Sequence, residues 1–287
     1  MIKSKKIKTL LGILIVLAVL FEVFSLIVAP KRQYYLIYDW MIYVTNYLII
    51  IALFLIIWNE KFRGIKAAVI AALIIANSTL MYFVGGVNLI VSKSPDKSHE
   101  VILKEYKNMR FETVNLKRRA MIFGKKVETL IGSSNYKSIE KNTYKIQWLN
   151  NDSALFIYDM DGKNNLKNTM FTLGDRGYIN YYYVMASIQG KWIDKDDDKS
   201  YFLNREKDVA YADGGSLRYY NNSKEEQFGL SSVIIPGDSM NSTLAISIDP
   251  SCELDENYQV VRGGSISIVE VTLKEAKVRR SSKSSTR

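Results

Sequence analysis

Two short acidic runs in the polar part of the chain have the residue types that bind calcium. The run Asp194–Asp198 carries carboxylates at alternate positions, which is the ligand spacing of calcium-binding loops. An EF-hand loop counted from its first residue would need glycine at position six and glutamate at position twelve, where this chain has lysine and arginine. The pair Asp159 and Asp161 fails similarly, because Lys163 occupies the third ligand position. We interpret the first run as a solvated hairpin turn and expect no bound metal or cofactor.

The chain has one histidine and one cysteine, which restricts zinc binding and several kinds of catalysis. His99 and Cys252 are 153 positions apart and form no recognisable zinc motif. A Ser-His-Asp or Cys-His mechanism would depend on His99, and no G-x-S-x-G motif accompanies it. We expect His99 at the surface, beside a polar strand.

The segment Gly237–Leu244 carries a pattern that suggests a nucleophile. Ser239 is its third residue, and Lys274 follows 35 positions later. The segment is similar to the serine box of signal peptidases and self-cleaving repressor proteases. In those enzymes a buried, neutral lysine activates the serine, since the loss of water lowers the pKa of the lysine. The resemblance implies a hydrolase with Ser239 as the nucleophile and Lys274 as the base.

Three features of the sequence argue against this hydrolase. The Gly-Asp turn and the apolar strand that should follow the serine box are missing. Strand alternation places Lys274 with Glu270 and Thr272 on the wetter face, opposite the apolar residues. The serine box also lies far in sequence from the apolar N-terminal region, unlike in signal peptidases. The hydrolase therefore stands as an alternative to a protein without enzymatic activity.

Three apolar runs precede all of these residues and must anchor them. The runs extend from Leu10 to Ala29, from about Leu36 to Trp58, and from Ala67 to Val91. A hydrocarbon layer about 30 Å thick needs about 20 apolar residues in a helix, and each run reaches that length. The first run is longer than the core of a usual signal peptide and no A-x-A site follows it, so we expect it to be retained. The sequence predicts a three-helix transmembrane anchor in residues 1–91.

The positions of lysine and arginine predict how these helices face the membrane. Seven such residues lie before the first run or between the second and third, and two lie between the first and second: Lys3, Lys5, Lys6, Lys8, Lys61, Arg63 and Lys66 against Lys31 and Arg32. Because positive flanks stay in the cytoplasm, the N-terminus is predicted inside and the polar part outside the cell membrane. Residues 92–287 contain 30 basic and 26 acidic residues, a balance that argues against nucleic acid as a partner.

Glu22 is an ionisable residue inside the first apolar run. Such a residue costs a few kcal/mol in a membrane unless it is paired, and it marks a functional position by default. Asn46 and Asn77 in the other two runs are its candidate partners. We interpret the three as polar contacts between helices, and the alternative is contact with the helices of a larger membrane complex.

After residue 91 the pattern changes to short alternating runs, which predicts a β-sandwich or barrel. Residues 92–162 are expected to form a small β module that opens with Ser94-Pro95-Asp96 and contains the buried strand Ala154–Tyr158. A helix is predicted near Asn165–Thr172. Three helices followed by such a module resemble a group of membrane proteins of Gram-positive bacteria with no established activity. That resemblance implies location and fold only.

Residues 163–278 are predicted to form a second β domain. Gly190-Lys191-Trp192 is similar to the G-x-W opening of lipocalin-like barrels, and the other interpretation is a tryptophan that packs in a sandwich core. Strands are expected over Tyr178–Ile188 and Ser265–Leu273, among others. The basic, serine-rich residues 279–287 are predicted to be a disordered tail.

Clustered tyrosines provide the main functional indication. Tyr181–Tyr183 and Tyr219-Tyr220 could form a recognition face, or they could pack in a core with their hydroxyls at the rim. We hypothesise a membrane-anchored, extracytoplasmic protein with a binding or protective role at the cell envelope. The expected partners are the lipid bilayer and an envelope protein or peptide.

Overall fold

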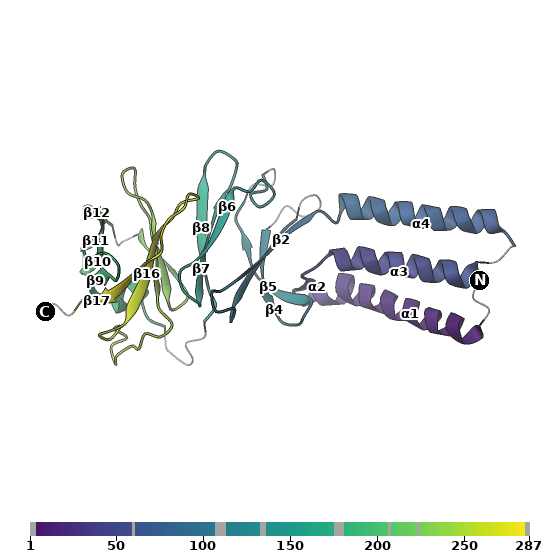
Figure 1. Cartoon of the computed structure of the whole chain (residues 1–287), viewed down its shortest axis with the longest axis horizontal. Helices are drawn as coiled ribbons and strands as arrows, with labels where there is room; N and C mark the ends of the chain where they lie inside the picture. The colour runs from purple at the N-terminus through teal and green to yellow at the C-terminus, as the bar shows by residue number, and fades with distance from the viewer. Residues whose placement is uncertain are drawn as a thin grey trace. The chain divides into compact units, whose positions relative to one another are not determined.

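The computed structural model describes residues 4–58, 61–106, 113–132, 136–174, 181–205, 208–221 and 224–284. These residues form two compact units (Figure 1). The first unit comprises residues 1–91 and 102–140, and the second comprises residues 92–101 and 141–287. The described residues between 102 and 140 thus group with the helices in this division.

Within the described residues, three helical stretches are long and apolar enough to cross a membrane. They are Lys5–Lys31, which contains α1 (Lys5–Val23), the π-helix η1 (Phe24–Val28) and α2 (Ala29–Lys31); α3 (Trp40–Ile57); and α4 (Arg63–Phe83). Both α1 and α4 pack against α3 (Figure 1). The prediction of three apolar helices at the N-terminal end is confirmed.

Two predicted helix borders are wrong, because apolar residues continue from helix into strand. Leu36 lies in β1 rather than in the second helix, and Val87–Val91 lie in β2 rather than in the third. Helix α4 ends just before Gly85, where a Cβ atom would lie 2.5 Å from the Met81 carbonyl oxygen. Glycine therefore allows the chain to leave the helix at a point where other residues would collide with it.

A proline accounts for the π-helix at the end of the first apolar stretch. Pro30 has no N–H, and its ring clashes with the carbonyl four residues earlier, so the regular α pattern cannot continue. The N–H of Ala29 instead bonds to the carbonyl of Phe24, five residues earlier. The helix ends at Lys31, and Gln33 turns the chain with a positive φ of 61°.

The first unit adds a five-stranded sheet to these helices. Its strand order is β1 (Tyr34–Leu36), β5 (Phe123–Leu130), β4 (Thr113–Arg118), β3 (Glu100–Tyr106) and β2 (Val87–Lys93). Strand β1 belongs to the connection between the first two apolar helices and pairs antiparallel with β5. A small core of Ile37, Ile102, Val114 and Leu116 lies against this sheet. The connection between these helices is therefore part of the sheet.

In the second unit, nine of the described strands form one antiparallel sheet, which curls into a half-barrel (Figure 1). The order is β12 (Ser216–Tyr220), β11 (Asp208–Asp213), β10 (Tyr201–Arg205), β9 (Gly190–Asp194), β17 (Arg279–Lys283), β16 (Ser265–Glu270), β15 (Leu244–Ile248), β14 (Ser232–Ile235) and β13 (Glu226–Phe228). Apolar side chains, including Trp192, Phe202 and Ile246, fill its core. Trp192 is fully buried and donates from Nε1 to the Ile188 carbonyl (2.8 Å).

The predicted disordered tail is wrong for Arg279–Lys283. These residues form β17, which lies between β9 and β16 near the middle of the sheet. Ser281 pairs with both neighbours, opposite Asp194 on one side and Ile266 on the other. Residues 285–287 lie outside the described residues.

A three-stranded sheet packs on the nine-stranded sheet. It contains β6 (Tyr144–Trp148), β7 (Ser153–Asp159) and β8 (Leu166–Thr172). Every residue of β7 is buried, which confirms the predicted central strand. The helix predicted near Asn165–Thr172 is wrong, since this segment forms β8. Between the sheets, Leu155 and Ile157 pack with Ile234 and Val269.

Another predicted strand is partly replaced by helix. Within Tyr178–Ile188, residues Val184–Ser187 form the short helix α5. Residues 178–180 lie outside the described residues. Val184 and Met185 of α5 pack into the core of the half-barrel, so their apolar character comes from helix packing rather than from a strand.

Candidate functional site

Ser239 and Lys274 lie at the same end of two adjacent strands, but neither is buried. Ser239 is exposed in the connection from β14 to β15, and Lys274 is exposed four residues after β16. The Val271 N–H donates to the Thr243 carbonyl (2.8 Å), which brings these two connections together. The lysine nevertheless lacks the dry environment that would make it a base. The geometry gives no support to the serine–lysine hydrolase.

The acidic turn at Asp194 is occupied by an arginine from β17. Asp194 accepts bonds at Oδ1 from the N–H groups of Asp196 (2.8 Å) and Asp197 (3.1 Å). Its Oδ2 lies 3.7 Å from a guanidinium nitrogen of Arg279, which also pairs with Asp213. The described residues contain no group of His, Cys, Asp and Glu that could hold a metal ion. The guanidinium of Arg279 therefore supplies positive charge to the carboxylates of this turn.

The Ser94-Pro95-Asp96 segment forms the turn between β2 and β3. Hydrogen bonds from the Ser94 hydroxyl, and then from the N–H and hydroxyl of Ser98, lower the pKa of Asp96 to about 2. His99 is half-buried beside this turn, and its Nε2 lies 3.3 Å from Asp152 Oδ1. Both residues therefore have structural partners.

The predicted contact between Glu22 and an asparagine of another helix is not made by the buried carboxylate oxygen of Glu22. Glu22 Oε1 is buried and has no hydrogen-bond partner. Asn77 is buried and donates from Nδ2 to the Tyr43 carbonyl (3.1 Å) instead. Asn77 thus joins α4 to α3, as expected of a polar contact between helices.

The tyrosines divide between the two interpretations. Tyr182 is 5% exposed and stacks on Tyr258, with ring centroids 5.4 Å apart. Its neighbours Tyr181 and Tyr183 are 66% and 67% exposed, and their rings pack edge to face at 5.6 Å. Tyr219 is exposed as well, whereas its neighbour Tyr220 is buried. Neighbouring tyrosines thus alternate between the core and the surface, so both interpretations apply to part of the set.

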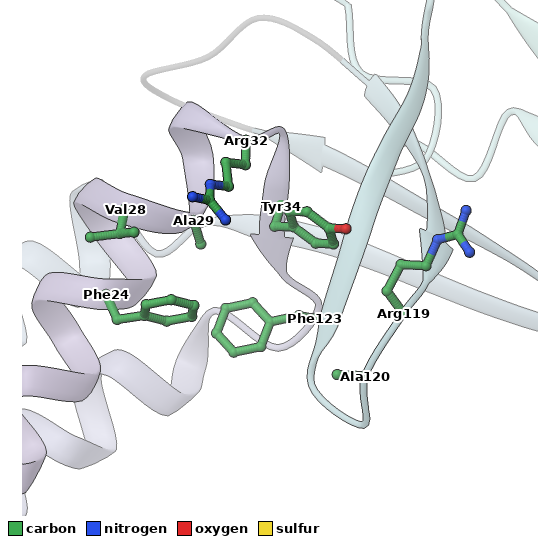
Figure 2. A pocket seen from close by; sticks show the side chains of 8 residues that line it. All are labelled: Phe24, Val28, Ala29, Arg32, Tyr34, Arg119, Ala120 and Phe123. Atoms are coloured by element: carbon green, nitrogen blue, oxygen red, sulfur yellow. The ribbon is translucent and has the colours of Figure 1, made fainter.

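The first unit contains a pocket at the junction of its helices and its sheet, with a volume of about 380 Å³ (Figure 2). The lining comes from η1, α2, the start of β1 and the β4–β5 turn: Phe24, Val28, Ala29, Arg32, Tyr34, Arg119, Ala120 and Phe123. The rings of Phe24 and Phe123 meet edge to face at 5.6 Å and join the helix to the hairpin. The pocket has an apolar floor and a basic rim.

Backbone pairing fixes both walls of this pocket. Leu36 pairs with Phe123 in the sheet, and the Ile37 N–H donates to the Ile122 carbonyl (2.8 Å). The guanidinium of Arg118 bonds to the Met121 carbonyl (2.6 Å) and closes the hairpin turn. Main-chain pairing and the Arg118 side chain therefore hold the two walls of the pocket in place.

A buried ion pair joins the connection between α2 and α3 to strand β3. Lys104 of β3 is fully buried, and its Nζ donates to the Leu36 carbonyl (2.6 Å) and to Asp39 Oδ1 (2.9 Å). Asp39 is the residue before α3, where a carboxylate also faces the positive end of the helix. Lys104 thus links β3 to β1 and to the start of α3.

Sequence reasoning did not identify the pocket, because its residues come from two segments about 90 positions apart. Pro30 followed by Lys31-Arg32 was the signal for a distorted, basic helix end. Comparison with known protein families found no match for this chain, and none was found among curated proteins or solved structures.

Proposed function

We propose that this protein is anchored in the cell membrane and uses its outward-facing β structure to bind an envelope protein or peptide, in a binding or protective role. The observation that carries this proposal is the edge-to-face pair of Tyr181 and Tyr183, whose rings remain exposed while Tyr182 fills the core. Exposed aromatic side chains are typical of recognition surfaces, because they give large contact area at low entropy cost.

The orientation of the proposed anchor rests on the positive residues at its ends. In a chain whose Cys252 is replaced by serine, we expect Ser239→Cys to react with a membrane-impermeant maleimide on intact cells. Both Ser239 and Ser4 are exposed, so Ser4→Cys should react only after lysis. The reverse pattern of labelling would show that the β structure is cytoplasmic.

Site-specific crosslinking tests the tyrosine surface. A photoreactive amino acid at position 181 is expected to give a discrete adduct with an envelope protein or peptide on intact cells. Tyr183→Ala should reduce the yield about tenfold, since aromatic residues often dominate binding energy. The same photoreactive residue at the exposed position Ser98 is the control. Identical adducts from both positions, or none from position 181, would contradict the proposed surface.

A further inference from the structure

We propose that the pocket at the helix–sheet junction binds the headgroup of an anionic phospholipid from the membrane that holds the helices. This proposal is independent of the tyrosine surface, which lies in the other unit. It rests on the position of the pocket floor, the charge of its rim, the exposed tip of the hairpin and the size of the cavity.

The floor of the pocket belongs to an apolar helical stretch. Phe24 and Val28 lie within Lys5–Lys31, which is long and apolar enough to span a membrane, and both side chains are exposed. A ligand in the pocket therefore lies beside a helix surface on which acyl chains can pack. A free, fully hydrated anion would make no use of this apolar half.

Two arginines give the rim of the pocket its positive charge. Arg32 and Arg119 approach from opposite walls, with Tyr34 seen between them in Figure 2. Both arginine side chains are exposed, and none of the described residues forms an ion pair with either. Guanidinium groups bind phosphate through paired, charge-assisted hydrogen bonds, and the tyrosine hydroxyl adds a donor. The chemistry of the rim matches a phosphate diester.

The hairpin beside the pocket carries an apolar residue where it meets the helix. Met121 is 84% exposed at the β4–β5 turn, two residues from Phe123. Since Phe123 contacts Phe24 of the spanning stretch, the turn lies at the depth of the helix end. Apolar side chains flanked by arginines are the composition that enters the membrane interface.

The cavity volume limits the ligand to part of a lipid. At about 380 Å³, the pocket falls at the small end of ligand sites, and a headgroup with its glycerol fits that space. The acyl chains would lie outside, against the exposed apolar side chains of α1, such as Leu17 and Leu20. One lipid per chain is therefore expected.

The test uses the full chain in nanodiscs that contain equal amounts of phosphatidylglycerol and phosphatidylcholine, with release into native mass spectrometry. The unaltered protein should retain one phosphatidylglycerol. In the double variant Arg32→Gln/Arg119→Gln, the fraction of protein that carries this lipid should fall about tenfold or more. The matched control Lys31→Gln/Lys117→Gln removes the same charge from exposed residues outside the lining and should retain the lipid.

Ala120→Trp provides a second variant, which fills the pocket without changing its charge. We expect it to abolish retention while the circular dichroism of the protein is unchanged. Equal loss in the lysine control, equal retention of both lipids, or retention in Ala120→Trp would overturn the proposal. Displacement of the lipid by millimolar inorganic phosphate would also overturn it, since a soluble anion would then be the ligand.

Discussion

Removal of residues 279–287 is expected to unfold the second unit. The deletion takes β17 from between β9 and β16, so both neighbours lose a paired strand at once. It also removes Arg279 and leaves the buried carboxylate of Asp194 without its countercharge. The expected loss is comparable to the whole stability of a domain, about 5–15 kcal/mol. Limited proteolysis and near-ultraviolet circular dichroism of the detergent-solubilised protein measure the effect.

The control for this deletion is a chain that ends at Ser284, which keeps all of β17. This chain should resist protease as the longer chain does. A disordered tail, as the sequence suggested, would make the two deletions equally harmless. Unchanged protease resistance after loss of residues 279–287 would therefore disprove the position of β17.

Lys104→Met is expected to destabilise the first unit by about 3 kcal/mol, near the lower end for a broken buried ion pair, since Asp39 is 26% exposed. The Leu36 carbonyl loses a donor and the carboxylate of Asp39 loses its countercharge. Hydrogen exchange of the β3 and β4 amides should become about a hundredfold faster, because the sheet opens more often.

Two further variants separate the buried pair from general effects of charge. Lys117→Met removes an exposed lysine from the adjacent strand β4 and should leave the exchange rates unchanged. Adding Asp39→Asn to Lys104→Met should restore part of the stability, since no buried charge is then left unpaired. Equal rates in Lys104→Met and the unaltered protein would show that the pair contributes nothing to the fold.

The sequence predicted the elements whose pattern is long and local. Three apolar runs indicated three helices, and the apolar run Ala154–Tyr158 indicated a buried strand. Their borders were less accurate, because Leu36 and Val87–Val91 are as apolar in strands as they would be in helices. A run of apolar residues reports burial in lipid or protein, and it does not report where a helix ends.

Elements stabilised by distant contacts could not be predicted. Arg279–Lys283 has the composition of a solvated tail, but it pairs with β9 and β16, and Arg279 forms ion pairs with Asp194, Asp197 and Asp213. Likewise, Phe24 and Arg119 acquire a common role only when the hairpin packs on the helix end. Neither residue belongs to a motif, so no local pattern marks the pocket.

The order in which the strands are synthesised constrains how this protein reaches its folded state. Strand β17 is the last of the nine to be synthesised. In the finished sheet it lies between β9 and β16 and pairs with both. Until residue 283 has emerged, the half-barrel presents two open strand edges, which are prone to aggregation. The nine-stranded sheet therefore cannot be completed until residue 283 has been synthesised.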